Sequence, residues 1–158
     1  MRRSGLSVIV TAALLVACTG GGEVTSVANS TEAGIPDAPA FEQYQDWNLP
    51  DPMPGWGPQP VVGWIDEGET FAVVTWGSSS CPYIPTALEA GGAAALTVTL
   101  TLPVSYEACT EDLGAWTHTF TLPDEVTGRP IAVTITGEDL SGFIAGDVGL
   151  QDVILELP

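Results

Sequence analysis

The feature that most constrains the fold is a series of short apolar runs, broken by turn residues, that begins near residue 61. Residues 97–102 read Thr-Val-Thr-Leu-Thr-Leu and residues 117–122 read Thr-His-Thr-Phe-Thr-Leu, so both segments alternate with a period of two. This period puts successive side chains on opposite faces of a β-strand and gives each strand one buried and one solvated face. The pattern therefore predicts an all-β domain.

Turn residues join these runs into hairpins. The Asp-Glu-Gly-Glu turn at 66–69 separates two predicted strands, and Gly91-Gly92 separates two more. The predicted strands comprise residues 61–65, 70–77, 84–89, 93–102, 117–122, 130–136 and 150–157, with one long loop at 137–149. Seven strands in about 100 residues are the number expected of an immunoglobulin-like antiparallel β-sandwich.

The N-terminus has a different pattern. Arg2 and Arg3 precede an apolar run over residues 6–16, and small residues lead to Cys18. A charged start followed by a short apolar run is typical of a signal peptide, and the run is too short for a membrane-spanning helix.

The sequence Leu15-Val16-Ala17-Cys18 resembles the lipobox of bacterial lipoproteins. The resemblance implies removal of residues 1–17, lipid on Cys18 and attachment to the outer face of the cell membrane. Two or three acyl chains anchor a protein stably where a single chain would not. The remaining chain would have 141 of the 158 residues and a formal charge of −19, because Arg2 and Arg3 are lost from a total of −17.

Two segments separate this anchor from the domain at residues 61–158. Residues 18–35 are small and polar after the cysteine and predict a flexible tether. Residues 36–60 hold seven prolines, which exclude a long helix or a central strand, although Asp37 is a candidate cap for a short helical turn.

The aromatic residues of this region leave two interpretations open. In the first, the aromatic side chains lie across an edge or an open end of the following domain and complete its core, with Phe41 and Tyr44 at helical spacing on one face. Alternatively, the aromatic side chains form a recognition strip for an envelope protein or a glycan. The candidate binding residues are Trp47, Trp56 and Trp64.

With Cys18 acylated, the two remaining cysteines, Cys81 and Cys109, predict a disulfide in an exported chain. A zinc site lacks ligands, since His118 is the only histidine. The stretch Trp-Gly-Ser-Ser-Ser-Cys-Pro at 76–82 and the later Cys-Thr-Glu-Asp at 109–112 resemble small extracytoplasmic proteins of actinobacteria. This second resemblance implies no activity.

Charge excludes one class of partner. The chain has 20 Asp and Glu against 3 Arg and no Lys, so it cannot present the basic face that nucleic acids require. Solubility on a crowded surface is the expected role of the acidity.

Catalytic and metal-binding alternatives rest on weaker patterns. A serine at 78–80 with His118 and Asp112 would form a hydrolase triad, but the motif lacks the second glycine of a nucleophile elbow, and His118 is expected on the solvated face of its strand. Adjacent carboxylates point to opposite faces of a strand and so do not suit glycoside hydrolysis. The pairs are Glu111-Asp112, Asp124-Glu125 and Glu138-Asp139.

Calcium has two candidate loops, neither with the spacing of an EF-hand. They contain Asp66, Glu67 and Glu69 in one and Glu138, Asp139, Asp147 and Asp152 in the other. No cofactor is expected. The sequence thus favours a lipid-anchored binding or structural module, with an envelope hydrolase and a calcium-dependent adhesion module as alternatives.

Overall fold

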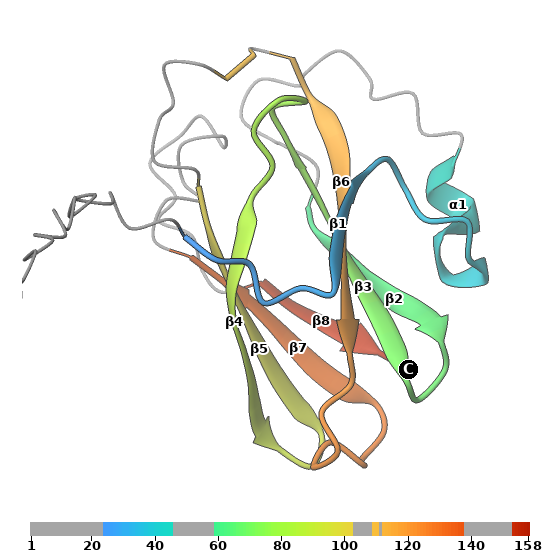
Figure 1. The fold of residues 1–158 in the computed structure, drawn as a ribbon. Coiled ribbons are helices and arrows are strands. Elements are labelled where there is room, and N and C mark those ends of the chain that lie inside the picture. The colour runs from blue at the N-terminus through green and yellow to red at the C-terminus, as the bar shows by residue number, and fades with distance from the viewer. Residues whose placement is uncertain (1–23, 46–58, 103–108, 111, 138–152) are drawn as a thin grey trace, which may run out of the picture.

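The chain folds as a sandwich of two four-stranded β-sheets (Figure 1). The structure, a computed structural model, describes residues 24–45, 59–102, 109–110, 112–137 and 153–158. In order across the sheet, sheet A contains β1 (Ser30–Ala33), β6 (Gly114–Thr121), β3 (Thr70–Gly77) and β2 (Val61–Asp66). Sheet B contains β4 (Ile84–Gly92), β5 (Ala95–Thr101), β7 (Ile131–Thr136) and β8 (Val153–Leu157). The predicted all-β sandwich is confirmed.

Both predicted hairpins are present. β2 and β3 pair antiparallel through the turn that contains Gly68, whose φ of 81° suits a residue without a Cβ. β4 and β5 also pair antiparallel, but Gly91 and Gly92 lie at the end of β4 and the turn itself is formed by Ala93 and Ala94. One pairing departs from the antiparallel expectation: β5 and β7 are parallel, because β6 lies between them in sequence but belongs to sheet A.

The core between the sheets follows the period-two pattern. Leu96, Val98 and Leu100 of β5 are buried, while the threonines between them are partly exposed. Phe71 and Phe120 stack with their ring centroids 5.2 Å apart. Apolar burial of this kind is the main stabilising contribution to a domain of this size.

A second apolar cluster covers the outer face of sheet A. The 3₁₀ turn η1 (Pro39–Phe41) and the helical turn α1 (Glu42–Gln45) place Phe41 and Tyr44 against this face. Phe41 is fully buried and packs with Ala72 and Val74. The described part of the proline-rich segment therefore packs on the domain, as the first interpretation predicted, although it covers a sheet face rather than an edge or an open end.

The cap of this turn is not the predicted one. Ala38 occupies the N-cap of η1 and makes no side-chain capping bond, so the expectation for Asp37 was wrong. The turn is held by packing instead, because Phe41 fills the space above Gly63 on β2.

We name residues 24–34 the N-terminal arm. Part of this arm is ordered on the domain, so the prediction of a flexible tether over residues 18–35 was wrong in this stretch. Residues 30–33 form β1 on the edge of β6, so the tether cannot extend unbroken to residue 35. The arm also crosses between the sheets. Val27 N donates to Pro85 O of β4 over 2.8 Å, and Asn29 N donates to Thr119 O of β6 over 2.8 Å (Figure 1). The arm thus closes one side of the sandwich.

Candidate functional site at the disulfide end of the sandwich

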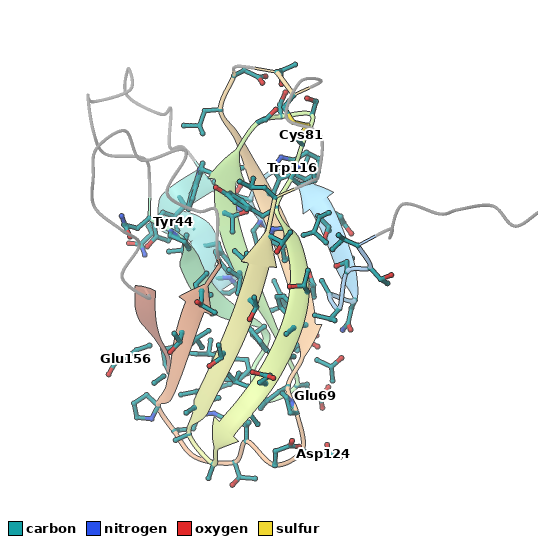
Figure 2. The ribbon with its side chains drawn as sticks, turned by 90° about the vertical axis from the view of Figure 1, so that its left-hand side faces the viewer. Tyr44, Glu69, Cys81, Trp116, Asp124 and Glu156 are labelled. Carbon is teal, nitrogen blue, oxygen red and sulfur yellow. A yellow bond between two sulfur atoms is a disulfide. The ribbon has the colours of Figure 1, made fainter. Side chains whose placement is uncertain are left out.

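A polar surface forms where β3 ends and β6 begins. Gly77 and Gly114 are the last pair of the antiparallel β3–β6 ladder, so the residues after β3 meet those before β6. The Cys81–Cys109 disulfide joins the two segments, with Cα atoms 5.5 Å apart, as predicted. The hydroxyl apex, as we name this surface, consists of Ser78, Ser79, Ser80, Thr110 and Asp112. Figure 2 shows Cys81 at this end and Asp124 at the opposite end.

The apex is organised around the hydroxyl of Thr110. Its Oγ1 lies 2.9 Å from Ser78 Oγ and 3.2 Å from both Ser79 Oγ and Ser80 Oγ. The Thr110 backbone N–H also donates to Ser80 Oγ over 2.9 Å. A hydroxyl has a single proton and two lone pairs, so the Thr110 hydroxyl cannot donate to all three serines at once. The exposed Ser79 and Ser80 hydroxyls can therefore form hydrogen bonds with other partners.

Asp112 carries the charge of the apex. The side chains of Ser79 and then Thr110 hydrogen-bond its carboxylate and lower its pKa from 3.8 to about 2. The Ser79 backbone N–H adds a further bond to Oδ1 over 3.2 Å. Because bonds that donate to a carboxylate favour its ionised form, Asp112 remains an acceptor across the whole physiological pH range.

Apolar side chains lie beside these polar groups. Trp116, half-buried on β6, donates its indole N–H to Ser78 O over 3.0 Å and so holds the serine loop. Leu113, next to Asp112, is 37% exposed and is one of two large apolar side chains classed as exposed in the described ranges. The apex therefore combines hydroxyls, a carboxylate and apolar surface.

His118 lies elsewhere, and its predicted solvent exposure was wrong. Positions 118 and 120 share one face of β6, so the imidazole points into the sandwich with Phe120 and is fully buried. Its Nδ1 lies 3.1 Å from Thr31 Oγ1 and its Nε2 lies 3.1 Å from Thr75 Oγ1. Burial lowers the pKa of His118 from 6.5 to about 4.

The candidate triad is consequently not assembled in the described structure. Asp112 binds Ser79, but both nitrogens of His118 are engaged by threonines of β1 and β3.

Trp64 is the one candidate binding tryptophan that the structure describes. It is half-buried, packs against the inner core and donates its indole N–H to Pro158 O over 2.5 Å. The Arg129 guanidinium lies 4.9 Å from its ring centroid. These contacts fit a structural role. Trp47, Trp56 and Cys18 lie outside the described residues.

A shallow groove lies between the arm and the outer face of sheet A. It encloses about 310 Å³ and is lined by Glu32, Ala33, Gly34, Ile35, Pro36, Asp37, Ile65, Thr117 and Thr119. Its carboxylates do not make a metal centre: among the described residues, no three His, Cys, Asp or Glu side chains are grouped to hold an ion. The acids at 66, 67 and 69 are likewise not gathered, and those at 138, 139, 147 and 152 lie outside the described ranges.

Neither helical turn in the described part of the chain has the length or apolar character needed to cross a bilayer. No protein-family model, no curated protein and no solved structure matches this chain.

Sequence reasoning found the serines and Asp112 but considered them as a loop that caps backbone groups or as a catalytic set, not as a binding surface. It missed Thr110, the centre of the network, and Trp116, which holds it. The signal was present in the predicted disulfide, since a bridge between Cys81 and Cys109 must bring Ser80 near Thr110.

Proposed function

We propose that this protein is a lipid-anchored binding module on the outer face of the cell membrane, and that its ligand is a neutral glycan of the envelope bound at the hydroxyl apex. The observation that carries the ligand proposal is the shared hydroxyl network around Thr110, with Asp112 at its side.

The chemistry of the apex favours a polyhydroxylated ligand. Ser80 offers a hydroxyl that both donates and accepts, Ser79 offers a hydroxyl oxygen that accepts, and Asp112 offers a charged acceptor. Half-buried Trp116 and exposed Leu113 supply apolar surface for the C–H face of a sugar ring. The strongly acidic chain repels anionic polymers, which favours a neutral glycan.

The disulfide supports this role by holding the two segments together before a ligand arrives. Groups held in place before binding lose less conformational entropy on association. The scaffold beneath them is a pair of paired strands rather than a long loop.

Glycan binding is tested by affinity gel electrophoresis of the full chain, solubilised in detergent, through gels that contain a mannan, a galactan or a glucan. We expect at least one polymer to retard the protein. Asp112→Asn should weaken the retardation about tenfold or more, the usual value of a hydrogen bond to a charged group. Asp124→Asn removes the same charge at the opposite end of the sandwich and should leave it unchanged (Figure 2).

Equal retardation of the Asp112→Asn and Asp124→Asn proteins would remove the apex from the binding site. Failure of all three polymers to retard the protein would contradict the glycan proposal itself.

The anchor rests on the N-terminal motif and is tested separately. Replacing Cys18 with Ala should move the protein from the membrane fraction to the medium or the soluble extract, and metabolic labelling with a fatty acid should fail. Full membrane retention of this variant would contradict the lipid anchor.

A further inference from the structure

His118 is a buried ionisable group that the proposed glycan site does not use. It lies on β6 between the edge strand β1 and the central strand β3, with one threonine hydroxyl at each ring nitrogen. A neutral imidazole fits this position, because it donates at one nitrogen and accepts at the other while each hydroxyl takes the complementary role.

Protonation of His118 leaves both hydrogen bonds in place, but it puts a positive charge in the buried interior of the domain. An imidazolium donates from both nitrogens, and both threonine hydroxyls can accept. The charge, however, is buried away from water, and burial of a charge without a counter-ion is costly.

No described carboxylate is placed to offset that charge. On β1 the single acid, Glu32, pairs with Thr117 on the outer face of the sheet and lines the groove. β3 and β6 carry no further ionisable group. On the facing sheet, β4 and β8 carry Glu89 and Glu156, both exposed, while β5 and β7 carry none. The phenol of Tyr83, in the inner core, is neutral in acid.

The N-terminal arm is the described segment that can detach from the domain at the lowest cost in free energy. β1 has four residues and pairs only with β6 among the described strands. The arm contributes one side chain, Ala28, to the inner core, and Val27 is 44% exposed. Elements with little buried apolar surface open at lower free energy than core strands. β3, by contrast, is paired on both sides and buried along almost its whole length.

The position of the arm links its release to hydration of the imidazole. It spans from β4 to β6 and closes the side of the sandwich, and its Thr31 contacts the ring directly. Detachment removes this contact and opens that side to water.

We propose that the N-terminal arm is an acid-released latch: protonation of His118 detaches residues 24–34 while the two sheets remain folded. Detachment also dismantles the groove, since Glu32, Ala33 and Gly34 form one of its walls. If Cys18 is the anchor, as proposed above, release adds the arm's 11 residues to the connection between membrane and domain.

The pKa values of His118 in the latched and in the exposed state determine how strongly acid favours opening of the arm. With a pKa of about 4 when latched and 6.5 when exposed, the equilibrium constant for arm opening rises as the pH falls. Relative to pH 7, it should increase about 20-fold at pH 5 and about 100-fold at pH 4.

The test is hydrogen exchange with mass spectrometry on the full chain between pH 7 and pH 4, with rates corrected for the intrinsic effect of pH on exchange. The backbone amides of the arm should lose protection on acidification. Peptides from β5 and β7 should retain theirs. Simultaneous loss in the arm and in these strands would mean that the whole domain unfolds, and would overturn the latch.

Two variants distinguish the effect of protonating His118 from the effect of protonating the carboxylates of the chain. His118→Gln keeps a donor and an acceptor but has no charge, so its arm should stay protected down to pH 4. Thr31→Val removes the hydroxyl on the arm and leaves His118 buried, so its arm should open at a higher pH than in the wild type. If the arm opens at the same pH in the wild type and both variants, His118 is not the trigger.

Discussion

Gly63 of β2 lies directly beneath Ala40 of η1: a Cβ at position 63 would stand 2.6 Å from the Ala40 Cβ and 2.9 Å from Cζ of Phe41. Real Cβ atoms do not approach so closely, so glycine at this point is what lets the helical turn pack on sheet A. Gly63→Ala should therefore destabilise the protein by about 1–3 kcal/mol, the range for overpacking. Chemical denaturation measures this directly.

The matched control is Gly77→Ala on the neighbouring strand. A Cβ there meets Tyr83 at 3.5 Å, an ordinary van der Waals distance. This substitution should be close to neutral. Equal losses for the two variants would indicate that the cost arises from the strand backbone and not from contact with η1.

The disulfide should be the largest single covalent contribution to stability. It closes a loop with a sequence separation of 28 residues. The chain-entropy model gives about 3.5 kcal/mol for a loop of this length. The Cys81→Ser, Cys109→Ser double variant should lose about this amount in urea denaturation and should also bind glycan less well. A double variant with unchanged stability would contradict the estimate.

Acid should destabilise the fold through His118, and the sign follows from the direction of the shift. Its pKa is lower in the folded protein, about 4, than in the unfolded chain, 6.5. Between these values the unfolded chain binds more protons, so the stability present above pH 6.5 falls as the pH approaches 4. The loss is at most about 3 kcal/mol, and less to the extent that arm release exposes the ring. Urea titrations at several pH values should show this slope, and His118→Gln should flatten it.

Arg129 should stabilise the edge of the sandwich through Trp64. The guanidinium lies over the indole ring, an arrangement worth about 0.5–1 kcal/mol at an exposed site. Arg129→Gln should lose that amount and Arg129→Lys should retain part of it, as measured by thermal unfolding. An effect that disappears at high salt would instead indicate screened interactions with the nearby hairpin acids.

β5 and β7 were predictable because their burial follows local alternation. Val98 and Leu100 face the core, and the threonines between them do not. The disulfide was predictable because assigning Cys18 to lipid leaves two cysteines, Cys81 and Cys109, in a chain expected to be exported. β1 was not, because Ser-Thr-Glu-Ala has no apolar alternation and becomes a strand only when β6 offers its edge.

The error at His118 has a different origin, which lies in the interpretation of its own strand. Threonines around it suggested a solvated face, although period two places it with Phe120. Its burial depends on Thr31 and Thr75, which are remote in sequence. The centre of the apex was also missed, although the predicted disulfide already brings Thr110 close to the serines.

The pairing of the arm with β6 also sets the order in which the molecule can be assembled. Thr31 and His118 are 87 residues apart, so the first described segment to be synthesised has no strand to join until most of the chain has followed it. Sheet B also forms late, because β5 pairs in parallel with β7, and β7 follows β6 of the other sheet in the sequence. Contacts this distant make folding slow. The N-terminal arm is thus made before β6, its partner strand, and docks late.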